Sequence, residues 1–170
     1  RNYYFYISRL GLQKHPELAV AACNKLGLSL KVAGTGQMLE NLKAMAGPTI
    51  DFLGAVNDDQ LVKLYAGARA LLYPVEDEDF GIVPVEAMAT GVPVIAHNSG
   101  GPKETVKIGK TGILFDELSE KGLVKAIENF EKNITNFKPV EIQQYAQQFN
   151  KKRFQQEIEK IVRFDPIVIN

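Results

Sequence analysis

The fold of this chain is set by one stretch of its sequence, Tyr73-Pro74-Val75-Glu76-Asp77-Glu78-Asp79-Phe80-Gly81-Ile82-Val83-Pro84-Val85-Glu86-Ala87-Met88-Ala89. The apolar run at 68–72 before it is typical of a buried strand, and the apolar run at 92–96, after Gly91, indicates the next strand. The stretch between them is predicted as a loop at the carboxyl end of a strand, followed by a helix that begins near Ile82. In a parallel α/β sheet, ligands bind at that position.

The start of this helix suits an anion. The first backbone amides of a helix lack intrahelical partners and lie at the positive end of its dipole. Pro84 fits the first turn, where a missing N–H is tolerated, and Gly81 lets the backbone approach a ligand closely. Glu78 in the loop and Glu86 about one turn into the helix bracket these amides. We therefore expect the amides to hold a diphosphate, while each carboxylate accepts hydrogen bonds from hydroxyl groups on either side of it.

Strands alternate with helices along the rest of the chain, without a polar linker or an internal repeat. The strands are predicted at 3–7, 28–33, 49–53, 68–72, 92–96 and 113–115. The helices are predicted at 16–26, up to 46, after an N-cap at 57–59, at 82–89 and 104–106, and then at 118–133, 139–149 and 151–163. This order indicates an α/β fold, a single Rossmann-like, doubly wound sheet of six parallel strands with C-terminal helices. The predicted domain covers residues 1–164, and the tail at 165–170 is left unassigned.

Composition narrows the class of protein. The chain has 170 residues, of which 45% are apolar, enough for one domain with a real core. The 20 basic residues equal the 20 acidic ones, which disfavours nucleic acid as a partner. The single cysteine, Cys23, is interpreted as a buried helix residue in a reducing, cytoplasmic setting. No apolar run is long enough to span a membrane and no signal peptide precedes the first strand, while the start at Arg1 without Met indicates a piece of a longer protein.

The spacing of Glu78 and Glu86, in Glu-Asp-Phe-Gly-Ile-Val-Pro-Val-Glu-Ala-Met-Ala, resembles the E-x7-E signature of the retaining glycosyltransferases of family 4. Further segments resemble motifs of that family and occur in its order: Ser8-Arg9-Leu10 with Lys14 (G-R-L…K-G), Ala33-Gly34-Thr35-Gly36 (the G-x-G turn), Phe52-Leu53-Gly54-Ala55-Val56 (F-x-G-x-V), and Gly91-Val92-Pro93-Val94-Ile95-Ala96 with Gly100, Gly101 and Glu104 (G-x-P-V-I-A…G-G-x-x-E). The resemblance covers the chain to about Phe164. It implies the C-terminal, donor-binding domain of a GT-B enzyme, which has two facing Rossmann-like domains.

The resemblance also implies a role for each matching residue. Arg9 and Lys14 would neutralise the donor diphosphate and stabilise its departure, which is chemically sensible for a fixed pair of cations. Glu78 would hold hydroxyls of the transferred sugar, and Glu86 would accept the ribose hydroxyls. Val56 would lie beside the base, and Gly34 would let the chain pass close to the nucleotide. Backbone amides for the diphosphate and the sugar would come from Phe80, Gly81, Ile82 and Val83.

The sequence departs from the family pattern in two ways. Ser8 stands before Arg9 and His15 stands after Lys14, where the family has glycines, and either could tighten the phosphate site without changing its logic. The N-terminal domain that supplies the family's acceptor site is missing from these 170 residues. The chain therefore holds the donor half of the implied site.

Other patterns favour other sites less. Asp77-Glu78-Asp79 spells the D-x-D that other glycosyltransferases use for a metal, but such a run is common by chance and we expect no metal site. Gly34-Thr35-Gly36 lacks the third glycine of a dinucleotide fingerprint and follows the second strand, which disfavours NAD. For His97 a structural hydrogen bond is favoured over a role in the site. A solvated helix face is favoured over a membrane-facing edge for the basic residues of the C-terminal helices: Lys132, Lys138, Lys151, Lys152 and Arg153.

The function that the resemblance implies is that of a hexosyltransferase in the full-length protein. It would move a hexose from a nucleoside-diphosphate sugar to an acceptor hydroxyl in glycan, polysaccharide or glycolipid synthesis, with retained anomeric configuration and no required cofactor. The donor would be GDP-mannose or a UDP-sugar, and this version of the motif favours mannose. A glycan or lipid-linked acceptor would bind through the missing domain, with peripheral contact to the cytoplasmic membrane. Two alternatives stay open: a nucleotide-sugar-binding module without transferase activity, and a sugar-nucleotide epimerase or hydrolase on the same scaffold.

Overall fold

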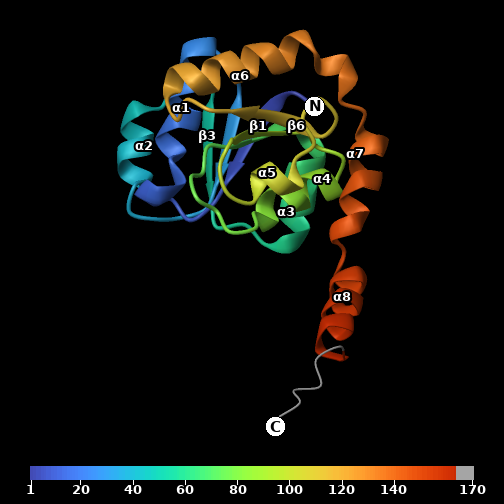
Figure 1. Cartoon of the computed structure of the whole chain (residues 1–170). Helices are drawn as coiled ribbons and strands as arrows, with labels where there is room; N and C mark the ends of the chain where they lie inside the picture. The colour runs from blue at the N-terminus through green and yellow to red at the C-terminus, as the bar shows by residue number, and fades with distance from the viewer. Residues whose placement is uncertain (164–170) are drawn as a thin grey trace.

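The structure of the chain, a computed structural model, describes residues 1–163. The predicted tail at 165–170 and the predicted domain boundary at 164 lie outside the described residues. Figure 1 shows the described part as one sheet enclosed by helices, with a last helix that extends from the body.

One sheet of six strands forms the centre of the domain. The strands are β1 (Tyr3–Ile7), β2 (Leu30–Ala33), β3 (Ile50–Gly54), β4 (Ala68–Tyr73), β5 (Val94–His97) and β6 (Gly112–Phe115). Their order is β3-β2-β1-β4-β5-β6, and every neighbouring pair is parallel. The predicted doubly wound parallel sheet is therefore confirmed. The chain leaves β1 toward β2 on one side and leaves β4 toward β5 on the other, so the connections after these adjacent strands diverge and leave a crevice at their carboxyl ends.

Helices cover both faces of the sheet (Figure 1). One face carries α1 (Pro16–Leu26), α2 (Leu39–Met45) and α6 (Glu120–Lys132), and the other carries α3 (Asp58–Gly67), α4 (Ile82–Ala89) and α5 (Pro102–Thr105). Then α7 (Pro139–Ala146) packs against α4, and α8 (Lys151–Arg163) ends the described chain. Three short 3₁₀ turns complete the connections, η1 (Leu12–Lys14), η2 (Ile134–Asn136) and η3 (Gln147–Phe149).

The core lies on both sides of the central strands. Tyr4, Phe5 and Tyr6 are consecutive residues of β1 and are all buried. Because consecutive strand residues point to opposite faces, their burial means that both faces of β1 are covered, as the continuous apolar run predicts. Cys23 is buried in α1, as predicted, and burial raises the pKa of its thiol to about 12.

The predicted N-cap of α3 is confirmed. The side chain of Asn57 accepts a hydrogen bond from the backbone N–H of Gln60, and the side chain of Gln60 accepts one from the backbone N–H of Asn57. This reciprocal pair is a capping box, which satisfies two amide donors that the first helical turn cannot use. It fixes where α3 begins after β3.

Strand β2 begins at Leu30, two residues later than predicted. Gly27 adopts a left-handed conformation with φ of 64° and donates its N–H to the carbonyl of Asn24. The N–H of Leu28 reaches back to the carbonyl of Cys23. These two bonds form a Schellman motif, so Leu28 closes helix α1 and does not start the strand.

Two helices also differ from the prediction. The helix expected at 139–149 ends at Ala146 and continues as the tighter turn η3, and the turns expected at 104–106 are a helix at Pro102–Thr105. Pro102 stands at the first helical position, where the missing N–H is tolerated. The proline, not the following glutamate, marks this helix start.

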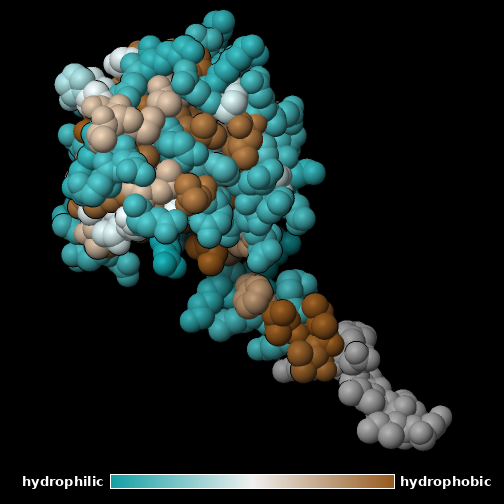
Figure 2. Space-filling model, turned by 90° about the vertical axis from the view of Figure 1, so that its left-hand side faces the viewer, coloured by the Kyte–Doolittle hydropathy of each residue, from teal (hydrophilic) through white to brown (hydrophobic). Residues whose placement is uncertain are grey.

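Helix α8 extends away from the body of the domain and contacts η3 (Figure 1). Its described side chains, from Lys151 to Val162, are exposed. The large apolar ones share one side at helical spacing and form the brown area next to the grey atoms in Figure 2: Phe154, Ile158, Ile161 and Val162. Within the described part of the chain, no helix combines the length and apolar content needed to cross a membrane.

Candidate functional site

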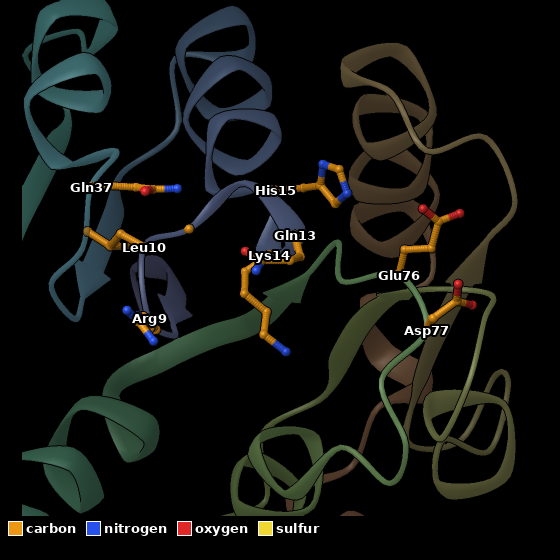
Figure 3. Close-up of a pocket in the computed structure, with 9 residues that line it drawn as sticks. Arg9, Leu10, Gln13, Lys14, His15, Gln37, Glu76 and Asp77 are labelled. Atoms are coloured by element: carbon orange, nitrogen blue, oxygen red, sulfur yellow. The ribbon is translucent and has the colours of Figure 1, made fainter.

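A cavity of about 720 Å³ opens at the carboxyl ends of β1 and β4. Its lining comes from the segment after β1, from the turn before α2 and from the loop after β4: Arg9, Leu10, Gly11, Gln13, Lys14, His15, Gln37, Glu76 and Asp77. In Figure 3, Lys14 lies between Arg9 on one side and Glu76 and Asp77 on the other. The cavity therefore occupies the crevice that the diverging connections leave.

Two further cavities adjoin the first. One of about 520 Å³ is lined by the ends of β1, β2 and β3, with Ile7, Ser8, Arg9, Gly34, Thr35, Gly36, Ala55 and Val56. The other, of about 440 Å³, is lined by Asp77, Glu78, Asp79, Gly100, Lys103 and Glu104. Arg9 lines the first and second cavities and Asp77 lines the first and third. The three cavities thus follow one another along one edge of the sheet.

The segment after β1 presents Lys14 from the 3₁₀ turn η1. The hydroxyl of Tyr6, in β1, donates to the carbonyl oxygen of Lys14 at 2.9 Å and lies 2.7 Å from Ser8 Oγ. His15 follows with φ of 48°, in the left-handed region, and is the N-cap residue of α1. A glycine adopts this conformation without strain, which explains why the family pattern has glycine where this chain has His15.

Lys14 and Glu78 form an ion pair across the crevice, with Nζ 2.6 Å from Oε2. The hydroxyl of Tyr73, the last residue of β4, donates to the same oxygen at 2.9 Å. The ammonium group of Lys14, followed by the hydrogen bond from Tyr73, holds the pKa of Glu78 below its ordinary value. Glu78 therefore carries its negative charge at neutral pH.

The loop that carries Glu78 is held by the segment after β5. Asp77 has φ of 51°, and its N–H donates to Ser99 Oγ at 3.1 Å. Ser99 Oγ also lies 3.0 Å from Nδ1 of His97, which is buried at the end of β5 with Nε2 3.3 Å from the carbonyl oxygen of Asp116. The predicted structural hydrogen bond of His97 is thus confirmed, since its two ring nitrogens contact Ser99 and the backbone of Asp116.

Gly34 lies where two backbones meet. Its φ is 116°, and a Cβ added there would lie 1.9 Å from the carbonyl oxygen of Ser8. Its N–H donates to the carbonyl of Gly54 at 2.7 Å. The close approach that requires a glycine is therefore to the segment after β1, on the floor of the second cavity.

Helix α4 begins at Ile82, as predicted. Its N-cap residue is Gly81, with φ of 78°, which has no side chain to accept a hydrogen bond from the first-turn amides. Phe80 and Ile82 are 47% and 64% exposed. Gly81 between them is buried, so the helix start is exposed on either side of its N-cap residue.

Glu86, on α4, is half-buried and accepts a hydrogen bond from the hydroxyl of Tyr65, on α3, at 3.1 Å. Burial raises the pKa of Glu86; the charge of Asp58 also raises it, while the bond from Tyr65 lowers it. The pKa values of the two predicted carboxylates are thus shifted in opposite directions, because the ammonium group of Lys14 lowers that of Glu78 and burial raises that of Glu86.

The structure brings some predicted residues together and leaves others apart. Arg9 and Lys14 line the first cavity, Arg9 with Gly34 and Val56 the second, and Glu78 the third. The remaining predicted residues line none of these three cavities: Phe80, Gly81, Ile82, Val83 and Glu86.

Sequence reasoning missed several residues of this edge. Gln37 and Glu76 line the first cavity without a motif to mark them, and Tyr65 and Tyr73 contact the two carboxylates. A signal existed for Tyr73, because a tyrosine that ends a buried strand places its polar hydroxyl at the carboxyl edge. Among residues 1–163, no group of three or more histidine, cysteine, aspartate or glutamate side chains is arranged to hold a metal ion.

The fold and this edge define a class of protein. A doubly wound α/β domain with cations and carboxylates at its switch point is the architecture of proteins that bind nucleotides. Over residues 1–152 the chain matches the family described as glycosyl transferases group 1. The chain belongs to that family.

Curated relatives and solved structures agree with this assignment. The chain is 39% identical over 117 residues to an uncharacterized glycosyltransferase of Methanocaldococcus jannaschii, a match that covers 64% of this chain and 30% of that protein. It is 35% identical over 138 residues to a GDP-mannose-dependent alpha-(1-6)-phosphatidylinositol monomannoside mannosyltransferase of Mycobacterium tuberculosis, covering 71% of this chain and 36% of that one. The crystal structure of Anabaena HepE in complex with UDP-glucose shares the fold, with a TM-score of 0.83 and 23% identity over 95% of this chain and 49% of that one. The chain therefore spans about half the length of this structural neighbour.

Proposed function

We propose that this chain is the donor-binding half of a retaining hexosyltransferase, which moves a hexose from a nucleoside-diphosphate sugar to an acceptor hydroxyl with retained configuration. The observation that carries the proposal is the ion pair of Lys14 and Glu78 at the switch point, beside Arg9. The pair puts a cation that neutralises phosphate next to a carboxylate that accepts sugar hydroxyls. In such a donor the diphosphate and the sugar are likewise neighbours.

The cations act on the leaving group. Arg9 and Lys14 neutralise the diphosphate, and the amides at 80–83, at the positive end of α4, add hydrogen bonds to its oxygens. As the bond from the sugar to the diphosphate breaks, negative charge grows on the diphosphate. Fixed cations and amides stabilise that charge, so leaving-group departure needs no metal or other cofactor.

The carboxylates act on the hydroxyl groups on either side of the diphosphate. Glu78 orients the transferred sugar, and Glu86 accepts hydrogen bonds from the ribose. The second cavity receives the base, because Ile7, Ala55 and Val56 give it an apolar lining beside Arg9. Same-face departure and attack then retain the configuration at the transferred carbon.

The relatives favour a mannose donor. The Mycobacterium tuberculosis relative is named as GDP-mannose-dependent, whereas the Anabaena structure contains UDP-glucose. We infer a hexose donor, with GDP-mannose ahead of UDP-sugars. The synthesis of glycans, polysaccharides or glycolipids is the setting that follows.

The acceptor is proposed to bind outside these 170 residues. The three cavities and the start of α4, which follows Asp79 of the third cavity, are assigned to the parts of the donor. The structural neighbour has about as much chain again as the matched half. A glycan or lipid-linked acceptor would then meet the donor from a facing domain. The protein is proposed to act in the cytoplasm, in peripheral contact with a membrane.

A thermal-shift panel of GDP, UDP, ADP and their sugars on this chain tests donor binding. A ligand at about 100 times its Kd stabilises the native state by about 2.7 kcal/mol, which should raise Tm by roughly 5–10 °C. The matched controls are the Glu86→Gln and Lys14→Gln variants, which should show smaller shifts. If no nucleoside diphosphate raises Tm and calorimetry detects no binding, the proposal is wrong.

Product analysis with the complete protein tests the reaction. Transfer of hexose to an acceptor with retained configuration supports the proposal. Release of free hexose or of an epimerised sugar nucleotide would replace it with the hydrolase or epimerase alternative, and donor binding without any product would leave a binding module.

A further inference from the structure

Two buried tyrosine hydroxyls reach the two carboxylates of the proposed site. Tyr73 ends β4 and is 3% exposed, and Tyr65 lies on α3 and is 2% exposed. Tyr73 donates to Glu78 Oε2 at 2.9 Å and Tyr65 donates to Glu86 Oε2 at 3.1 Å. Each carboxylate is thus held from the core side by one phenol.

The hydroxyls are not required for packing. A phenylalanine fills nearly the same volume, and burying a hydroxyl is unfavourable unless it finds a partner. Here burial, together with the neighbouring carboxylates, raises the pKa of both phenols well above its ordinary value. Both groups therefore stay neutral and keep a proton to donate at neutral pH.

The geometry fixes which carboxylate oxygen meets a ligand. On Glu78 the bonds from Tyr73 and Lys14 both end on Oε2, so neither has to break for Oε1 to accept a hydroxyl of a ligand. On Glu86 the bond from Tyr65 likewise ends on Oε2. A carboxylate whose rotation is stopped in this way loses less freedom when it binds.

Both phenols are themselves fixed by the core. The ring of Tyr65 packs edge-to-face on Phe5 of β1, with centroids 5.3 Å apart and an interplanar angle of 88°. Tyr73 is buried at the end of β4, where its backbone pairs with Ala96 of β5, so its ring has little room to turn. The orientation of the carboxylates is therefore set by the sheet and its helices.

We propose that Tyr73 and Tyr65 are positioning residues, Tyr73 for the grip of Glu78 on the transferred sugar and Tyr65 for the grip of Glu86 on the ribose. The inference rests on the proposed function. It assigns the two tyrosines to different parts of the donor, so loss of each hydroxyl should weaken the binding of a different set of ligands.

Calorimetry on this chain separates the two roles. Nucleoside diphosphate and the matching nucleoside-diphosphate hexose, chosen from the thermal-shift panel, are each titrated into Tyr65→Phe and Tyr73→Phe. Tyr65→Phe should weaken both ligands by about 5- to 10-fold, because both contain ribose. Tyr73→Phe should weaken only the sugar-bearing ligand by a similar factor and leave the affinity for the nucleoside diphosphate within about two-fold.

The control variant is Tyr3→Phe. The hydroxyl of Tyr3 donates to the carbonyl of Leu64 at 2.7 Å, so this variant also loses a tyrosine hydrogen bond, but one that does not involve a carboxylate. It should lower Tm without changing either affinity. A purely structural role for Tyr65 and Tyr73 would give the same result as Tyr3→Phe and would overturn the inference.

Glu78→Gln and Glu86→Gln separate this inference from the proposed function. If these two variants bind both ligands as the unaltered chain does, the proposed function fails. If they weaken binding while the tyrosine variants do not, the carboxylates act without their tyrosines and only the positioning inference fails.

Discussion

Lys14 Nζ lies 2.6 Å from Glu78 Oε2, and this ion pair joins the segment after β1 to the loop after β4. These are the two connections whose divergence forms the crevice of the sheet. The pair balances one positive and one negative charge at the point where the proposed diphosphate and sugar meet. A donor that binds there can use both partners without breaking the pair, since its phosphates attract Lys14 and its hydroxyls can donate to Glu78 Oε1, while Lys14 and Tyr73 stay bonded to Oε2.

Replacing Lys14 by Gln should reduce the transfer rate of the complete enzyme by on the order of 10²-fold or more, because a cation that stabilises the departing diphosphate is lost. The fold should lose less than about 1 kcal/mol, since the two side chains are 34% and 24% exposed and solvent screens the pair. Steady-state kinetics and urea unfolding measure the two effects. Lys25→Gln, which breaks the exposed pair with Glu120, is the control, and a rate for Lys14→Gln near that of the unaltered enzyme would contradict the proposed role.

Replacing Glu86 by Gln should weaken nucleotide binding and stabilise the fold. The neutral amide cannot match a carboxylate as an acceptor of ribose hydroxyls, so Kd should rise about 10-fold. Burial raises the pKa of Glu86, so its contribution to stability is present at low pH and is lost as pH rises through the folded-state pKa. Gln does not titrate and can still accept the bond from Tyr65, so Tm should be higher at pH 7 than in the unaltered chain. Calorimetry and thermal melts at pH 4 and pH 7 test both statements, and an unchanged nucleotide affinity would remove the ribose role.

Replacing Glu131 by Gln should flatten the acid limb of the stability curve. Arg69 makes two hydrogen bonds to Glu131 and Tyr4 donates a third, and the pKa of Glu131 is lowered, chiefly by Arg69. A lowered pKa gives stability that is present above the ordinary value of 4.5 and lost as pH falls through the folded-state value. Urea unfolding should therefore show a loss of about 1–2 kcal/mol at pH 7 and a smaller one near pH 3. Glu128→Gln, an exposed change on the same helix, is the control and should leave the dependence of stability on pH unchanged. The same dependence on pH in both variants would be evidence against the pairing of Glu131 with Arg69.

Replacing Gly34 by Ala should destabilise the fold more than the same change at Gly54. Both residues have positive φ, which a side chain tolerates poorly and which costs about 1 kcal/mol. At Gly34 the added Cβ also meets the carbonyl oxygen of Ser8 at 1.9 Å, whereas nothing lies within 4 Å of one at Gly54. The expected loss at Gly34 is about 2–4 kcal/mol by chemical unfolding, with weaker nucleotide binding in the adjoining cavity. Equal losses at the two glycines would show that the contact with Ser8 relaxes freely.

The sequence predicts the sheet well because its strands are continuous apolar runs, which a doubly covered parallel sheet requires. Helix starts with a clear chemical signal, such as Asn57 and Pro16, are also where the sequence puts them. The start of β2 could not be predicted, because Leu28 looks like a strand residue and is taken by the closing hydrogen bond of α1. The local sequence pattern does not predict whether the N–H of Leu28 bonds to the preceding helix or to a neighbouring strand.

For the candidate site, the sequence proposes individual residues but not the contacts between them. Motif order identifies Lys14 and Glu78, but their contact spans 64 positions and depends on β1 lying next to β4. Tyr65 looks like a core residue in an apolar pattern, and only the packed structure shows that its hydroxyl reaches Glu86. For Tyr73, its place at the end of a buried strand indicates where the hydroxyl lies, but not that it contacts Glu78. At His15 the structure adds a reason that the sequence does not give. Its backbone is left-handed, a conformation that suits the glycine expected there from the family pattern.

The opposite end of the parallel sheet is formed by the amino ends of the strands. The exposed turn at Lys110, ahead of β6, lies at that end, away from the three cavities. Because the one native thiol, Cys23, is buried and weakly acidic, a Lys110→Cys change would give a single reactive handle for a dye or a surface tether. The domain could then be immobilised, or ligand binding followed by fluorescence, while the crevice stays accessible to solution.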